Sequence, residues 1–207
     1  MLTKKGTESR RKIIDAAIAL IDAKGYDQTT MPDICRSAGV ATGTFYHYFK
    51  SKQDVITAYI HEENEAVLEF YHKLGRTTFS ETICKVMHFK LDIYQARGPE
   101  FVRQMVAVLM GSSRQTFTEN AYAWMQILSE SFQEGQRQGE FTSSISAGLL
   151  CDITASMFFF FTSLWSSQPE DYSLHELLDA KISAVLEIAR GSLPQDQLKD
   201  LSTVEQE

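Results

Sequence analysis

The sequence is poor in proline and cysteine, and no charged leader precedes an apolar run at its start. Its 207 residues include four prolines and three cysteines. Cys35, Cys84 and Cys151 form no close pair and no metal-ligand spacing, so we expect no disulfide framework. The stretch from Met1 to Lys12 is polar and basic, unlike a secretory signal. We therefore expect a reducing, cytoplasmic location.

Strand-like alternation is almost absent, whereas apolar residues recur at helical spacing. We predict an all-α protein, and the 43% apolar content is enough for a packed core. The five histidines are His47, His61, His72, His88 and His175. They show no metal-ligand spacing, so we predict no metal site. No catalytic triad spacing, phosphate-binding glycine loop or paired carboxylates stand out, and we expect neither enzyme activity nor a cofactor.

Positive charge is scarce overall but is concentrated at the N-terminus. The whole chain has a net charge of −7. Residues 1–52 carry nine basic and five acidic side chains, a net charge of +4, so the remainder carries −11. A positive end attracts phosphate while the acidic remainder is repelled from it. This asymmetry favours a nucleic-acid partner for the N-terminal part.

Two short helical patterns within residues 29–52 are joined by a tight turn at Gly39, which can adopt a positive φ without a Cβ clash. Thr30 and Asp33 predict a capping box for the first pattern. The second, from Thr42 to Tyr48, begins with small hydroxylated residues and continues with aromatic and basic ones. A longer helix precedes them, from about Thr7 to Ala23. This order predicts a helix-turn-helix motif.

Residues 8–52 resemble the DNA-binding domain of the TetR family of bacterial transcriptional repressors. The matching pieces, in family order, are Ile13–Ile21, Lys24–Tyr26, Thr29–Ile34 and Gly39–Lys52. The resemblance implies a helix-turn-helix domain over 1–52 and a helical ligand-binding and dimerisation domain over 53–191. We expect a polar tail over 192–207.

The resemblance also implies a function. We expect a homodimeric, ligand-responsive repressor that binds a pseudo-palindromic operator in double-stranded DNA. A small apolar or amphipathic organic effector would release it. Two alternatives stay open: a TetR-like activator or a regulator controlled by a protein partner, and an enzyme or carrier built on the helical domain.

The predicted DNA contacts divide into two kinds. The residues predicted to reach base edges are Thr42, Gly43 and Thr44. Those predicted to reach phosphates are Thr30, Tyr46, His47, Tyr48 and Lys52. Phe45 and Phe49 are four apart, a spacing that predicts an inward-facing pair. Ala41 stands where relatives commonly have Ser or Thr, so the usual N-cap hydroxyl is missing.

Five further helices are expected in the second domain, after a long helix capped by Ser51. Their predicted ranges are 81–95 with Ser80 as cap, 99–110, 118–138, Ser144 to about Trp165, and a last helix from Ser173 to Arg190. Gly98–Pro99, Gly111 and Gly139 supply the helix ends, and Ser173 with Glu176 predicts a capping box.

The segment Ile145–Trp165 is apolar on most faces, but Asp152 near its middle argues against a membrane span. By resemblance we instead expect Ser146–Ser166 and Ser173–Arg190 to form a dimer interface. The predicted dimerisation residues are Phe159, Leu178, Ile182 and Leu186.

Bulky aromatic and methionine side chains between these helices suit an apolar effector pocket. The predicted ligand-binding residues are Met87, His88, Tyr94, Arg103, Met105, Trp124, Phe158 and Trp165. For any single one of them, an ordinary core position is the simpler interpretation. Basic residues over 80–170 are scattered, which disfavours a strongly anionic effector such as a nucleotide.

Overall fold

The computed structural model describes the backbone of residues 4–111 and 114–191, and the side chains of residues 6–111 and 123–191. These described residues form nine α-helices and no strand, which confirms the all-α fold. The helices are α1 (Lys4–Lys24), α2 (Met31–Ala38), α3 (Thr42–Tyr48), α4 (Lys52–Lys73), α5 (Phe79–Arg97), α6 (Pro99–Met110), α7 (Arg114–Arg137), α8 (Ala147–Ser167) and α9 (Leu174–Ala189). The predicted tail over 192–207 lies outside the described residues.

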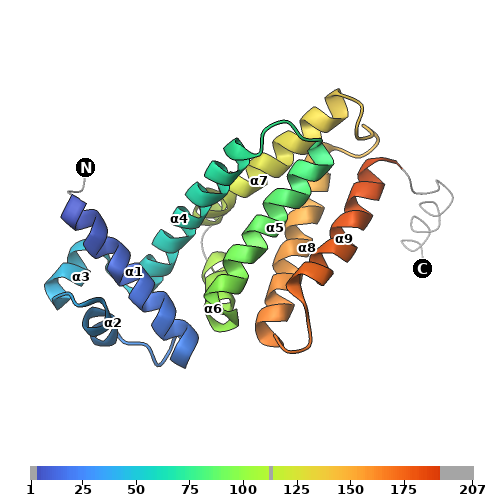
Figure 1. Ribbon diagram of the computed structural model, residues 1–207. Helices are drawn as coiled ribbons and strands as arrows, with labels where there is room; N and C mark the ends of the chain where they lie inside the picture. The colour runs from blue at the N-terminus through green and yellow to red at the C-terminus, as the bar shows by residue number, and fades with distance from the viewer. Residues whose placement is uncertain (1–3, 112–113, 192–207) are drawn as a thin grey trace.

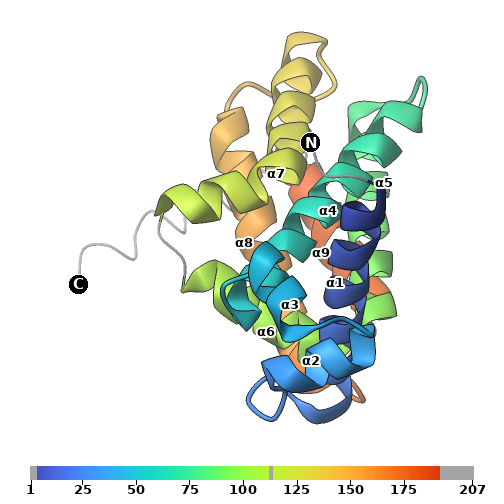
Figure 2. The same ribbon diagram turned by 90° about the vertical axis from the view of Figure 1, so that its left-hand side faces the viewer.

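Helices α1 to α3 form a small head at one end of the molecule (Figures 1 and 2). Helix α1 packs against α2 and α3. Their shared core is apolar, with Ile13, Ile14, Ile34, Phe45 and Phe49 buried. The inward orientation predicted for the two phenylalanines is confirmed.

The predicted helix caps and the turn in the head are confirmed by the structure. Thr30 caps α2, and its hydroxyl and the Asp33 side chain complete a capping box. Gly39 has φ = 65°, which turns the chain sharply between α2 and α3. Helix α3 has the predicted bounds, and its N-cap Ala41 makes no side-chain hydrogen bond. Helix α1 begins at Lys4, three residues before the predicted start.

Helix α4 leads directly from the head into the rest of the molecule, which we call the body (Figure 1). The Ser51 hydroxyl caps it by accepting from the Asp54 N–H. Helix α4 contacts α1 in the head and α5, α6 and α7 in the body. A single unbroken helix therefore touches both parts.

Two predicted helix starts in the body are wrong. Thr78, not Ser80, caps α5, because the Ser80 hydroxyl is buried and bonds to Glu140 and Arg190. Ser146, not Ser144, caps α8. Helix α7 also begins at Arg114, four residues earlier than expected.

The head is fitted closely against the body. Helix α1 contacts α5 and α6 as well as α4. Gly98, at the turn between α5 and α6, has φ = 87°, and a Cβ there would collide with the carboxylate of Asp22 at the end of α1. This close approach requires glycine.

Helix α8 is long and rich in apolar residues, and half of its apolar stretch is buried inside the protein. By length and composition alone it is apolar enough to cross a membrane. In the fold it packs against α6, α7 and α9. Its apolar character is therefore explained in part by a core position.

Candidate functional site

The outer face of α3 carries the residues predicted to contact DNA. Thr42, Gly43 and His47 are exposed, and Tyr46 is 51% exposed. Thr44 and Tyr48 are half-buried, and the edge of the His47 ring meets the ring of Tyr48 at 4.7 Å between centroids. Because Phe45 and Phe49 anchor the opposite face, these polar groups are presented to solvent in a fixed orientation.

Gly43 has no internal reason to be glycine. It lies in regular helix, and a Cβ added to it meets no atom within 4 Å. The fold itself therefore does not require glycine here, and close approach of DNA remains the predicted reason for it. This is what a helix that must lie close against a DNA groove requires.

Thr30, predicted as a phosphate contact, is already engaged within the head. Its hydroxyl accepts from the Asp33 N–H at 3.3 Å and donates to Asp33 Oδ2 at 2.8 Å. Lys24 Nζ lies 2.7 Å from the same carboxylate oxygen. The hydrogen bond from Lys24, and then that from Thr30, lower the pKa of Asp33 well below its usual range. Thr30 therefore has a structural role independent of any DNA contact.

Lys52 likewise has an internal partner. Its ammonium donates to the carbonyl oxygen of Tyr26 at 2.6 Å and lies 4.1 Å from the centroid of the Tyr26 ring. The side chain ties the start of α4 to the loop between α1 and α2. Its role as a phosphate contact stays a prediction.

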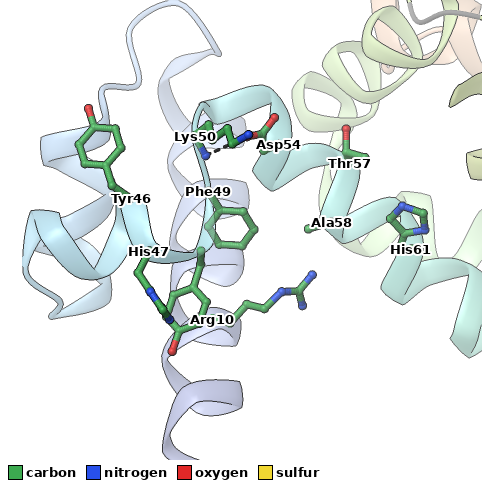
Figure 3. Close-up of a pocket in the computed structure, with 10 residues that line it drawn as sticks. Arg10, Tyr46, His47, Phe49, Lys50, Asp54, Thr57, Ala58 and His61 are labelled. Atoms are coloured by element: carbon green, nitrogen blue, oxygen red, sulfur yellow. Dashed lines mark hydrogen bonds between the residues drawn. The ribbon is translucent and has the colours of Figure 1, made fainter. Parts of the chain in front are cut away.

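A surface hollow lies beside the end of α3 (Figure 3). Its lining residues include Arg10 of α1, Tyr46 and His47 of α3, and His61 of α4. In Figure 3, Tyr46 and His61 lie at opposite sides of the hollow, and Arg10 lies between them. Arg10 and His61 were not among the residues predicted from the sequence, because they lie outside the motif and reach the hollow through the packing of α1 and α4.

The structure gives the predicted ligand-binding residues two different surroundings. Six of them lie in the core of the body: Met87, Tyr94, Met105, Trp124, Phe158 and Trp165. The rings of Tyr94 and Trp124 contact that of Phe158, at 5.6 and 5.1 Å between centroids. These six are therefore core residues, which was the simpler interpretation of the sequence. Their contact with an effector stays a prediction.

The two predicted polar fixing points lie elsewhere. Arg103 is exposed and pairs with Glu100. His88 is half-buried between α5 and α9, where its Nδ1 lies 2.9 Å from Nδ1 of His175 and its Nε2 lies 2.8 Å from Oδ1 of Asp179. Arg103 thus pairs at the surface and His88 pairs with residues of α9, and the assignment of both to an effector pocket stays a prediction. Among the described residues no group of three or more His, Cys, Asp and Glu side chains is arranged to hold a metal.

An ion pair inside the body was not predicted from the sequence. Lys90 of α5 bonds to Glu63 of α4, and both side chains are almost completely buried. The Lys90 ammonium lies 4.8, 5.4 and 5.8 Å from the ring centroids of Tyr94, Trp124 and Phe158. We refer to these five residues as the charged core cluster.

The helical spacing contains a signal for this pair. Lys90 lies four residues after Val86 and four before Tyr94, on the buried face of α5. Glu63 lies four residues after Tyr59 and four before Val67, on the buried face of α4. A charged residue on each apolar stripe predicts a buried pair.

The buried carboxylate of Glu63 also affects two neighbouring tyrosines. Burial foremost, and then the charge of Glu63, raise the pKa of Tyr94 well above its usual value and that of Tyr59 to about 12.

Glu62, next to Glu63 on α4, binds the head instead. Its carboxylate oxygens lie 2.6 Å from Arg10 Nη1 and 2.7 Å from Arg11 Nη1. Of these two consecutive carboxylates on α4, Glu62 therefore binds the head and Glu63 binds the body.

Three of the four predicted dimerisation residues face the interior of the subunit. Leu178, Ile182 and Leu186 are buried against the protein's own core, and Phe159 is half-buried with its ring centroid 5.8 Å from that of Trp124. Helix α9 is apolar on two faces, and the sequence pattern did not distinguish the inner from the outer one. These three positions are core residues, which corrects their assignment to an interface.

The exposed apolar face lies on α8. Leu149, Ile153 and Phe160 are 51%, 39% and 66% exposed, and they follow one side of the helix with the half-buried Met157 and Leu164. We call these five residues the α8 stripe. Such a contiguous apolar surface is typical of an interaction site.

Comparisons with known proteins agree with this geometry. Residues 13–59 match the family described as bacterial regulatory proteins, tetR family. A fatty acid metabolism regulator protein of Bacillus subtilis (strain 168) is 25% identical over 183 residues, which cover 84% of this chain and 92% of that protein.

Two solved structures share the fold. The transcriptional regulator FadR from Bacillus subtilis, in complex with stearoyl-CoA, has a TM-score of 0.73 and 25% identity, covering 89% of this chain and 99% of that one. The repressor FadR of Thermus thermophilus, in complex with lauroyl-CoA, has a TM-score of 0.67 at 22% identity, covering 86% and 93%.

The N-terminal part of the chain is therefore a helix-turn-helix DNA-binding domain of the tetR family, and the chain as a whole is similar in sequence and fold to TetR-family transcription regulators.

Proposed function

We propose that this protein is a homodimeric repressor that leaves its operator when a small molecule with an apolar acyl chain enters the body. The observation that carries the proposal is α4, which runs without a break from the DNA-binding head into the interior of the body. Any change in the packing of α4 within the body is passed directly to the head.

The operator contact rests on the exposed face of α3. Thr42, Gly43 and Thr44 would read base edges in the major groove, while Tyr46, His47 and Tyr48 would bond to phosphates. Lys52 and Thr30 would also contact DNA phosphates, in addition to their partners within the protein. Because half-sites on DNA lie about 34 Å apart, a dimer must hold its two α3 helices at that separation.

The dimer would form through the outer faces of α8 and α9. The α8 stripe offers apolar area, and the outer side of α9 adds small or apolar residues, among them Leu177, Ala180, Ala184 and Ile188. Small residues allow helices of two subunits to approach closely. The predicted helix pair is kept, but the contact residues move from the inner face of α9 to its outer face.

The effector class follows from the interior and from the relatives. The aromatic and methionine side chains of the body suit an acyl chain, and the Bacillus subtilis FadR structure holds stearoyl-CoA. Several basic residues of the body are paired with acidic ones, as Arg103 is with Glu100 and Arg137 with Glu134. We therefore assign the apolar chain to the interior and any strongly charged part of the effector to the surface. Action in the cytoplasm follows from this function.

Release of DNA by an acyl compound tests the proposal. Fluorescence anisotropy on a labelled operator, identified by selection from random duplexes, measures binding by the purified chain. We expect lauroyl-CoA or dodecanoate to lower the operator affinity at least tenfold, and a short acyl compound such as acetyl-CoA to have no effect. An affinity unchanged by any acyl compound, with operator binding intact, contradicts the effector class and leaves the DNA-binding function standing.

A further inference from the structure

The charged core cluster is a poor device for stability. Moving two charges out of water costs free energy that their mutual attraction only partly restores, and apolar side chains of similar size are often as stable or more so. The Lys90–Glu63 pair nevertheless lies beside the rings of Tyr94, Trp124 and Phe158, a place where two apolar side chains would complete the core. A function other than folding explains a charged pair at this place.

The pair is also incomplete. Glu63 Oε2 is buried and has no hydrogen-bond partner among the residues that the structure describes. An ammonium carries three N–H donors, and within the same described residues the Lys90 ammonium has a single oxygen acceptor, Glu63 Oε1. Within this described part of the chain, N–H donors of Lys90 that have no oxygen acceptor therefore lie beside aromatic rings that suit an apolar chain. This combination matches a molecule that is apolar along its length and carries an oxygen acceptor at one end.

We propose that the Lys90 ammonium binds the acyl oxygen of the effector, either the carbonyl of a thioester or the carboxylate of a free acid, and that this contact loosens Glu63. The inference rests on the proposed function, since it assigns a contact to the acyl effector. The rings of Tyr94, Trp124 and Phe158 hold the first part of the chain. Lys90 contributes a positioned charge that neutral residues of the cluster lack.

Loosening Glu63 has a defined mechanical route to the DNA. An acyl oxygen that accepts from a second N–H of Lys90 shares the ammonium with Glu63 and weakens the ion pair, and a buried carboxylate with a weakened cation is unfavourable. Glu63 relieves this cost when α4 shifts and carries it toward water. The next residue, Glu62, forms ion pairs with Arg10 and Arg11 of α1. A shift of α4 at this point therefore moves the head.

The main test compares the full-length protein with a double variant that removes the pair without leaving one charge buried. The double variant Glu63→Met/Lys90→Met replaces both members by flexible apolar side chains, which is the change that folded proteins tolerate best at buried ion pairs. Its matched control is Glu69→Met/Lys73→Met, which removes an exposed pair from the same α4 helix. Circular dichroism checks the fold of each variant.

Three probes of one chain length separate the head groups: lauroyl-CoA, dodecanoate and dodecane. Binding is followed by intrinsic fluorescence, because Trp124 lies in the cluster and the chain has two tryptophans. Release is followed by anisotropy on the operator, relative to each variant's own affinity. We expect the double variant to bind the acyl probes at least tenfold more weakly, about the effect of one hydrogen bond to a charged group, and dodecane equally well. The control should respond like the wild type.

The single variant Glu63→Gln distinguishes the two sources of the acyl oxygen. It keeps Lys90 but removes the competing charge, so dodecanoate should bind at least tenfold more tightly than to the wild type if the free acid is the effector. If the thioester is the effector, lauroyl-CoA gains and dodecanoate binds weakly to both proteins.

Two results overturn the assignment in different ways. A double variant that binds and responds to both acyl probes as the wild type does removes Lys90 from the site and leaves the acyl effector standing. A wild type that binds neither acyl probe removes the effector class together with the role of Lys90.

Discussion

The head and the body place their polar and apolar groups in opposite ways. In the head the interior is apolar, apart from Thr29, whose hydroxyl donates to the Gly25 carbonyl at 2.8 Å, and polar groups cover the outer face of α3. In the body, apolar side chains of the α8 stripe face outward and the pair Lys90–Glu63 lies inside. The head thus follows the ordinary globular pattern, whereas the body departs from it both at its surface and in its interior.

Buried polar groups elsewhere in the body show which departure matters. The hydroxyls of Thr154 and Thr162 on α8 donate to carbonyls one turn earlier in the same helix, at 2.7 and 2.6 Å. Such bonds satisfy a buried hydroxyl locally and ask nothing of neighbouring helices. The Lys90–Glu63 pair instead joins two helices and leaves Glu63 Oε2 without a partner in the described part of the chain. A ligand can exploit the second arrangement but not the first.

The largest effect is expected at the inner face of α9. Leu186→Glu puts a carboxylate among buried apolar groups, and we expect the subunit to lose several kcal/mol of stability, enough to unfold many domains. Thermal unfolding followed by circular dichroism measures the loss. Leu186→Met, which conserves volume, should cost less than about 1.5 kcal/mol. A folded but monomeric Leu186→Glu protein would return this residue to the subunit interface.

The outer face of α8 is expected to respond differently to the same chemical change. Phe160 is 66% exposed, so Phe160→Glu should keep the fold and the melting curve of the isolated subunit. If the α8 stripe is buried between two subunits, an unpaired carboxylate there costs several kcal/mol and dissociates the dimer. Sedimentation velocity gives the oligomeric state, and Gln168→Glu, at the exposed end of α8, is the control. A dimer that survives the change at Phe160 locates the interface on another face.

The contrast between the two parts explains what the sequence predicted well. In the head, Thr30, Gly39 and Ser51 act through neighbours a few residues away, so their roles were readable from spacing and were confirmed. The predicted start of α5 failed because the partners of the expected cap residue are far away in sequence. Ser80 resembles a cap locally, but Glu140 and Arg190 use its hydroxyl.

Orientation was harder to predict than helix position. Leu178 and Ala184 both lie on α9 and both suit a helix-helix contact, yet the first is buried inside the subunit and the second is exposed. Which face turns inward depends on α5 and α8, whose packing no local pattern reports. The same holds for Lys90, whose spacing indicates burial but does not name Glu63 as its partner.

An intermediate effect is expected on the outer face of the head, where Gly43 separates stability from DNA binding. Gly43→Ala adds a methyl group that meets nothing in the subunit, and alanine favours helix over glycine by up to about 1 kcal/mol. We expect equal or higher thermal stability together with operator binding weaker by about 1–3 kcal/mol, because the methyl group keeps α3 from the base edges.

Anisotropy with operator and with unrelated duplex DNA checks the result for Gly43. The loss should be larger on the operator than on unrelated DNA, since phosphate contacts carry no sequence information. Gly148→Ala, which also meets nothing within 4 Å, controls for the added methyl group in a helix of the body. Equal losses on both DNAs would assign Gly43 to the phosphate backbone.

The smallest effect is expected at the N-cap of α3, where the head departs from its relatives' usual residue. Ala41 has the extended conformation of an N-cap, with φ = −71° and ψ = 150°, but offers no hydroxyl to the first turn. Ala41→Ser lets a hydroxyl accept from the Thr44 N–H and should stabilise the protein by about 1 kcal/mol, which raises the melting temperature by roughly 2–4 °C in a chain of this size. Ala41→Val, with no hydroxyl, should give no such gain.

Operator affinity measured on the same samples separates two roles of the new hydroxyl. Tighter binding of Ala41→Ser to every duplex, beyond the change in stability, indicates a phosphate contact. A higher melting temperature with unchanged DNA binding instead confines the effect of the missing cap to the stability of the head.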